Sequence, residues 1–287
     1  MFNLATPQQA KDWCEAERAA GHGLGYVPTM GALHEGHLSL IRRAVDESDS
    51  SCVSIFVNPL QFNDVNDFER YPRDLAHDRR RLEQMRVSMC FVGTLTDFFP
   101  GASAVDEVAL LDPGPFAAGL EGEHRPGHLQ GVCTIVDRLF RTVGPCRAYF
   151  GEKDFQQTLV VRDLAKHLGY PDVVVCSTIR EPSGFALSSR NVLLNKSQKR
   201  LATCLYAALM EARHAWEDGE RDARVLRDTM HRTLDRPGIS LDYAEVRDPE
   251  AWSVESPQGP MVRAQALIAV TIGGVRLIDN LRLDKGS

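Results

Sequence analysis

Two histidines, His34 and His37, stand three residues apart, directly after a run of residues typical of a buried strand. They close the segment Pro28–His37, which also contains Gly31 and Gly36. Glycine lets a backbone approach a ligand closely, and the unpaired N–H groups of a helix N-terminus suit a phosphate. Imidazoles in the first helical turn can donate hydrogen bonds to phosphate oxygens as charge builds in a transition state. The segment therefore predicts a phosphate site; the alternative is a surface turn with two incidental histidines.

A second polar cluster, Asn58-Pro-Leu-Gln61-Phe62, follows the next predicted strand. Asparagine and glutamine offer both donors and acceptors, which suits a hydroxyl or carboxylate on a small substrate. Asn58 alone could instead form an Asx-type turn, but that alternative leaves Gln61 unexplained.

A third cluster lies in Phe150–Gln157, which also follows a strand and opens a helix. Gly151 permits close backbone approach, and Lys153 is a point charge that suits a phosphate. Asp154 could bind a ribose hydroxyl or orient Mg²⁺. The alternative is a charged helix start with Asp154 as its N-cap.

The fourth cluster is Ala186–Asn191, where Ser188, Ser189 and Arg190 offer two hydroxyls and a guanidinium. These groups would make a good phosphate clamp, although an N-cap and a solvated arginine would have the same sequence. No Gly-x-x-x-x-Gly-Lys-Ser/Thr is present, and no Gly-x-Gly-x-x-Gly follows a strand. The four clusters together predict a nucleoside triphosphate site of another kind.

Zinc is the competing interpretation of the histidines. His34 and His37 lack the i,i+4 spacing of a helical zinc pair. His124 and His128 have that spacing, but Pro126 and Gly127 interrupt the helix that would align them. The sequence therefore predicts no metal held by protein ligands alone.

Strands and helices alternate in the first two-thirds of the chain, which predicts a parallel sheet with helices on both faces. Ligands bind such sheets at the carboxyl ends of the strands, where three of the four clusters lie. Residues 93–119, rich in Pro, Gly and Ala, are expected to form a long surface loop. The predicted strands are 23–27, 51–57, 87–92, 148–150 and 172–179, and the predicted helices include 38–45, 79–85, 131–143 and 156–168.

Helices followed by strands are predicted after about residue 180, which indicates a smaller α+β unit. We therefore divide the chain into a nucleotide- and substrate-binding domain, residues 1–180, and a C-terminal domain, residues 181–287. The predicted elements of the second domain are helices 197–217 and 223–234 and strands 241–246, 264–271 and 275–281.

Composition limits the classes of protein to consider. The 287 residues include 33 Lys and Arg against 39 Asp and Glu, a net charge of −6. This disfavours nucleic acid as a partner, but a few local cations can still bind a small anion. Seven cysteines without a Cys-x-x-Cys pair suggest buried thiols in a reducing compartment. Without a signal peptide pattern or an 18-residue apolar run, the expected location is cytoplasmic, with no membrane partner.

As a set, the motifs resemble those of the pantothenate synthetase (pantoate–β-alanine ligase) family, in the Rossmann-like superfamily of adenylyl-transferring enzymes. The resemblance covers nearly the whole chain. Val27-Pro-Thr-Met-Gly with Leu33-His34-x-Gly-His37 resembles the "HIGH" signature, and Ser188-Ser-Arg-Asn191 resembles the second, "KMSKS"-like signature. Departures are Ser183 for a usual Asp, Phe185 for Leu and Leu129 for Phe. Further matches are Ser54–Phe62, Tyr71–Arg73, Leu120–Gly122, Arg125–His128, Gly131-Val132 and Phe150–Gln157.

The resemblance implies that pantoate attacks ATP to form pantoyl adenylate, from which β-alanine displaces AMP to give pantothenate. It also implies Mg²⁺ with ATP, a homodimer and a C-terminal domain that closes over the first. His37 would be the proton donor, supported by the catalytic residues His34, Lys153 and Arg190. Asn58, Gln61 and Gln157 would bind pantoate, and Gln61 also β-alanine. ATP would contact Met30, Gly31, Ala32, Leu33, His34, Glu35, Gly36, His37, Gly151, Glu152, Lys153, Asp154, Ile179, Leu187, Ser188, Ser189 and Arg190.

Two other functions fit the first histidine motif. A nucleotidyltransferase of the same superfamily would keep AMP on its product. A regulatory protein would bind ATP without turnover. Gln61 and Gln157 favour a small carboxylate or uncharged polar acceptor over a phosphorylated one.

Overall fold

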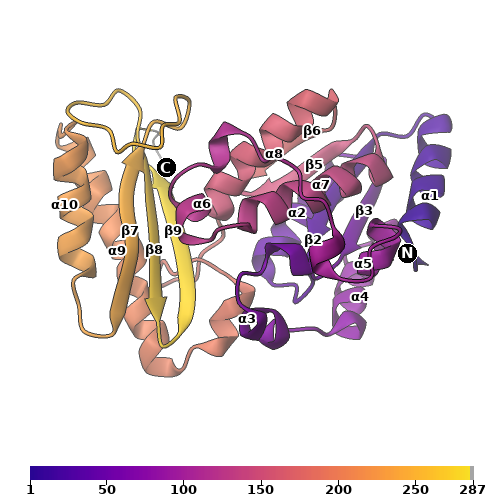
Figure 1. Ribbon diagram of the computed structural model, residues 1–287, viewed down its shortest axis with the longest axis horizontal. Coiled ribbons are helices and arrows are strands. Elements are labelled where there is room, and N and C mark those ends of the chain that lie inside the picture. Colours follow the sequence, from indigo (N-terminus) through magenta and orange to yellow (C-terminus); the bar gives the residue numbers. More distant parts are fainter. Residues whose placement is uncertain (285–287) are drawn as a thin grey trace. The chain divides into compact units, whose positions relative to one another are not determined.

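The first sheet consists of parallel strands in the order β1-β4-β3-β2-β5-β6 (Figure 1). They are β1 (Phe2–Leu4), β2 (Leu24–Thr29), β3 (Ser50–Ile55), β4 (Met89–Val92), β5 (Arg147–Gly151) and β6 (Asp172–Cys176). The predicted parallel sheet is confirmed in this computed structural model, which describes residues 1–284. Because β2 pairs with both β3 and β5, the loops after these three strands leave from one edge of the sheet.

Helices cover both faces of this sheet, as predicted. Tyr26 belongs to a buried cluster with residues of α1 (Pro7–Ala19), α7 (His128–Val143) and α8 (Phe155–Leu168). The next residue, Val27, belongs to another cluster with residues of α2 (Glu35–Asp46) and α4 (Leu75–Gln84). Successive side chains of a strand point to opposite faces, so these two clusters show that β2 is covered on both sides.

The segment 93–119 differs from its prediction as a surface loop. It contains α5 (Leu95–Phe98) and two short 3₁₀ turns. Phe98, Phe99 and Val108 are buried in the cluster that contains Tyr26. The prediction was wrong for this part because it weighed the turn-forming residues and ignored the apolar side chains between them. Three α-helices among residues 1–284 but outside this segment, α1, α3 (Val65–Arg70) and α6 (Glu121–His124), were not predicted either.

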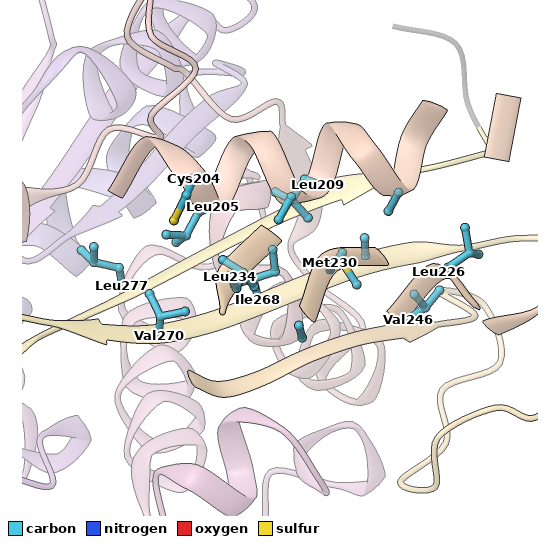
Figure 2. Packing of buried hydrophobic residues seen from close by; sticks show 14 of the residues in the cluster. Cys204, Leu205, Leu209, Leu226, Met230, Leu234, Val246, Ile268, Val270 and Leu277 are labelled. Atoms are coloured by element: carbon cyan, nitrogen blue, oxygen red, sulfur yellow. The ribbon is translucent and has the colours of Figure 1, made fainter. Parts of the chain in front are cut away.

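The second sheet is antiparallel, in the order β7-β8-β9, and lies against two long helices (Figure 1). Its strands are β7 (Ile239–Arg247), β8 (Gln265–Ile272) and β9 (Val275–Arg282), and the helices are α9 (Lys196–Glu217) and α10 (Ala223–Leu234). Figure 2 shows helix side chains such as Leu209 and Met230 over Ile268 and Val270 of β8. The predicted α+β arrangement is confirmed.

The chain forms two compact units. The first comprises Met1–Ala117, Arg125–Glu152 and Gln156–Ser177. The second takes the described chain from Thr178 onward, together with Ala118–His124 and Lys153–Phe155. The segment Ala118–His124 includes the short helix α6 (Glu121–His124). The predicted boundary at residue 180 is a single division of the chain. It places Ala118–His124 and Lys153–Phe155 in the first domain, whereas they group with the second unit.

The cysteines are all free thiols, and six of the seven are buried. Burial raises the pKa of Cys90 and of Cys133 to about 11, because a thiolate loses its hydration there.

A thiol reacts as the thiolate, so we expect iodoacetamide at pH 8 to add less than about one label per native chain. All seven should react in denaturant, as intact mass can show. Several labels on a chain with unchanged circular dichroism would contradict this burial.

No helix within residues 1–284 combines the length and the apolar character needed to cross a membrane.

Candidate active site

Asp78 holds the loop that follows β2 and carries the first predicted cluster. Asp78 is 2% exposed, and its carboxylate oxygens accept the N–H groups of Ala32 and Leu33 at 2.9 Å each. Gly31 has a φ of +78°, and a Cβ there would lie 2.9 Å from Asp78 Oδ2. Conformation and space therefore both require glycine. Asp78 was not predicted as a site residue; its one signal is a carboxylate directly before three arginines, Arg79–Arg81.

An Asp78→Asn substitution is expected to lower the free energy of unfolding by about 1–3 kcal/mol, because an amide NH₂ would face a backbone N–H. Urea unfolding measures this change. Asp74→Asn on the same helix is the matched control. Asp74 caps α4 by accepting the His77 N–H at 2.9 Å, and asparagine caps equally well. Equal losses in the two variants would contradict the special role of Asp78.

His34 and His37 lie at the start of α2, and the backbone determines their tautomers. His34 Nδ1 accepts the Gly36 N–H at 3.1 Å, and His37 Nδ1 accepts the His34 N–H at 3.4 Å. A ring nitrogen that accepts carries no proton, so each neutral imidazole carries its proton on Nε2. The ring centroids are 4.1 Å apart. The pair therefore presents its ring N–H donors from one helix N-terminus.

Arg81 braces the same turn. Its guanidinium donates to the Leu33 carbonyl oxygen at 2.8 Å and to the Glu35 carboxylate at 2.7 Å. A rigid guanidinium with two bonds fixes the backbone just before the His34 cap.

Asn58 and Gln61 lie at the 3₁₀ turn η1 (Pro59–Gln61) after β3. Asn58 is 1% exposed; its Oδ1 accepts the Leu60 N–H at 3.2 Å. Its Nδ2 donates to Gln61 Oε1 and to the Gly131 carbonyl, at 3.1 Å each. Asn58 thus orients the Gln61 side chain and ties this turn to α7.

Arg125 and His128, which match the family motif but were given no role, also contact Gln61. His128 Nδ1 donates to the Gln61 carbonyl oxygen at 2.8 Å. A carbonyl only accepts, so His128 Nε2 carries no proton in the neutral ring and accepts from Arg125 Nη1 at 2.9 Å. The backbone also packs closely here, because a Cβ on Gly131 would lie 2.1 Å from the Leu60 oxygen.

The third cluster is divided between the two units. Gly151 ends β5, and Glu152 follows it in the first unit. Lys153 and Asp154 group with the second unit, and Lys153 Nζ lies 3.5 Å from Asp154 Oδ1. The Lys153 side chain is 19% exposed, so its ammonium group is only partly accessible to solvent. Gln157 is half-buried on the first turn of α8.

The fourth cluster follows a small hairpin in the second unit. Leu187 N–H donates to Ile179 O at 3.0 Å, closing the hairpin. Ser188 caps the 3₁₀ turn η5 (Ser189–Leu193), with Oγ accepting the Arg190 N–H at 3.3 Å. Ser188, Ser189 and Arg190 are half-buried.

Arg180 supports the base of this hairpin through Asp279 of β9. Its guanidinium donates to the two carboxylate oxygens at 2.6 and 2.9 Å and to Gly184 O at 3.1 Å. Burial raises the pKa of Asp279, and the Arg180 charge opposes that effect.

Within each unit the predicted residues gather on neighbouring segments. The first unit brings together Met30–His37, Asn58 and Gln61, and Gly151-Glu152, on the loops after β2, β3 and β5. The second unit holds Lys153, Asp154 and the segment from Ile179 to Arg190. Among residues 1–284, no three His, Cys, Asp or Glu side chains are grouped so that they could hold a metal ion.

Known proteins match this chain over almost its full length. The family model described as pantoate-beta-alanine ligase matches residues 3–282. Pantothenate synthetase of Roseiflexus castenholzii is 45% identical over 272 residues, covering 94% of this chain and 96% of the relative. That of Rubrobacter xylanophilus is 44% identical and covers 98% of both chains.

Solved structures agree. The crystal structure of pantothenate synthetase from Thermus thermophilus has a TM-score of 0.88 at 39% identity and covers 99% of both chains. The pantoate-beta-alanine ligase from Francisella tularensis, complexed with beta-gamma ATP and beta-alanine, has a TM-score of 0.81 at 33% identity. It covers 100% of this chain and 99% of its own. With its two histidines at the start of α2 and a fold shared throughout with these enzymes, the chain belongs to the pantoate–β-alanine ligase family.

Proposed function

We propose that the protein condenses pantoate with β-alanine in an ATP-dependent reaction that passes through pantoyl adenylate and releases pyrophosphate and AMP. The observation that carries this proposal is the histidine pair at the start of α2. Both Nδ1 atoms accept backbone N–H groups, so each neutral ring keeps an Nε2–H donor suited to phosphate oxygens. Membership of the ligase family supports the same chemistry.

In the first step, a carboxylate oxygen of pantoate attacks the α-phosphorus of ATP. The new P–O bond forms as the bond from the α-phosphorus to the bridging oxygen of pyrophosphate breaks. Two anions must be brought together, so the charge on the transferring phosphoryl group has to be neutralised and the reactants aligned. We assign this task to His34, His37, Lys153 and Arg190, with His37 as the proton donor. The loops 30–37, 151–154 and 187–190, with Ile179, would supply the remaining ATP contacts.

In the second step, the neutral amine of β-alanine attacks the carbonyl carbon of pantoyl adenylate. The C–N bond forms, the C–O bond to AMP breaks, and the amine loses a proton. Gln61 and Gln157 would bind pantoate, and Gln61 would also contact β-alanine. The contacts of Asn58 support an indirect role, because its amide hydrogens already serve Gln61 and the Gly131 carbonyl.

Mg²⁺ would accompany ATP and lower the charge of the triphosphate. Mg²⁺ keeps several waters and is commonly held by substrate phosphates with one or two carboxylates. Asp154 fits this mode, since its carboxylate is part-exposed and would be one such ligand. We also propose a homodimer in the cytoplasm, and a C-terminal domain, residues 181–287, that acts as a lid and keeps water from the acyl adenylate.

A coupled assay of AMP release with ATP, pantoate and β-alanine tests the function. We expect AMP release that requires all three substrates and Mg²⁺. Mass spectrometry of the product separates the ligase from the nucleotidyltransferase alternative, which retains AMP on its product. Folded protein that releases no AMP in response to β-alanine would contradict the proposal.

A further inference from the structure

Asn280 of β9 connects the second sheet to Lys153. Asn280 is 4% exposed, and its Nδ2 donates to the Lys153 carbonyl oxygen at 2.9 Å. Since a carbonyl oxygen only accepts, this contact determines which end of the Asn280 amide carries the NH₂ group. The other end, Oδ1, accepts from Gln265 Nε2 of β8 at 2.8 Å.

Gln265 is unfavourable for stability at its position. It is fully buried in the central strand of the sheet, and its Oε1 has no hydrogen-bond partner. A buried polar atom without a partner costs free energy, so stability of the sheet alone does not explain an amide at this position. What the Gln265 amide supplies is a donor to Asn280 Oδ1, which holds the Asn280 NH₂ toward Lys153.

The backbone of Asn280 is fixed as well. Its N–H donates to Asp279 Oδ1 at 2.8 Å, and its carbonyl accepts from Arg180 at 3.1 Å. Arg180 also donates to both carboxylate oxygens of Asp279, at 2.6 and 2.9 Å, so the neighbouring residue is held by the same guanidinium. The pair Asp279-Asn280 thus contacts both Lys153 and the arginine at the base of the hairpin that leads to Ser188.

We propose that Asn280 is a positioning residue that places Lys153 for ATP by holding its main-chain carbonyl. The inference rests on the proposed function, in which Lys153 neutralises phosphate charge. Asn280 does not itself touch ATP in this proposal. It sets where the Lys153 side chain starts, and an error of about 1 Å in such a group can cost about 10²-fold in rate.

A double-mutant cycle with Asn280→Asp and Lys153→Met tests the proposal on the full-length protein. Asn280→Asp replaces the NH₂ donor by an oxygen that repels the Lys153 carbonyl. We expect it to lower kcat/KM for ATP about 10-fold or more in the wild-type chain, and less than about 2-fold in the Lys153→Met chain, because coupled residues are not additive. The matched control is Asn195→Asp, the exposed N-cap of α9, where aspartate also caps.

Equal fold losses in the two backgrounds would overturn the inference, since a merely structural role affects both alike. If Asn280→Asp does not fold, Asn280→Ala removes the donor without repulsion and enters the same cycle. Failure of both variants to fold would show that the amide serves stability and would also overturn it. A wild-type chain without AMP release, or a Lys153→Met chain with full activity, would instead refute the proposed function or the assigned role of Lys153.

Discussion

Replacement of His37 by alanine is expected to lower kcat for β-alanine-dependent AMP release by about 10² or more, because the transition state loses an aligned donor. The fold should persist, since the bond that the ring Nδ1 accepts from the His34 N–H is long, at 3.4 Å. Steady-state kinetics with a thermal melt measure the two effects separately. Unchanged turnover would reject the assigned role of His37.

Two further substitutions separate the two roles of the His37 ring, which are to accept the His34 N–H through Nδ1 and to donate a hydrogen bond through Nε2. His37→Asn keeps an acceptor for the His34 N–H but has no group at the place of Nε2, so it should be as slow as the alanine variant. His37→Gln carries an amide NH₂ toward that place and should recover part of the rate. His167→Ala is the matched control, because the side chain of His167 is 74% exposed near the end of α8. A fast His37→Asn enzyme would show that capping, and not donation, matters.

Replacement of Lys153 by methionine is expected to lower kcat/KM for ATP by about 10²–10³, the range found when a transition-state donor is removed. Methionine keeps the apolar stem of this largely buried side chain and removes the ammonium. Kinetics with varied ATP at saturating pantoate and β-alanine provide the measurement.

Lys153→Arg restores the charge without the geometry of an ammonium and should regain only part of the activity. Lys166→Met provides the control, since Lys166 is exposed in the last turn of α8. If Lys153→Met and Lys166→Met behave alike, Lys153 has no role with ATP.

Local pattern predicted most of the sheet and the long helices. Helix α10 was predicted at its observed bounds, 223–234. In the structure Asp222 caps it, and its buried residues Ala223, Leu226, Met230 and Leu234 recur at helical spacing. The strand β1 and the helix after it were missed. β1 has only three residues, none of them buried, so it carries no apolar run, although Thr6 and Pro7 form a typical helix start.

The residues whose side chains could bind or catalyse were predicted from their spacing in the sequence, because each cluster lies on one short segment after a strand or hairpin. The residues that support them were not. Asp78 binds the loop amides of Ala32 and Leu33 from 46 and 45 positions away, and Asn280 binds Lys153 from 127 positions away. Periodicity and turn signals are local, and they hold no information on such pairs.

By itself, the sequence of this protein determined the parallel sheet, the α+β unit, the family and the loops that carry histidine, lysine and serine. These features follow from the spacing of apolar residues, from the glycines and prolines that end helices and strands, and from motifs that are contiguous in the chain. Only the tertiary structure decided that Asp78 holds the first loop, that His128 holds Gln61 and that Asn280 holds Lys153. The reason is physical: a buried backbone group must find a partner wherever folding brings one within hydrogen-bond distance, whatever the separation along the chain.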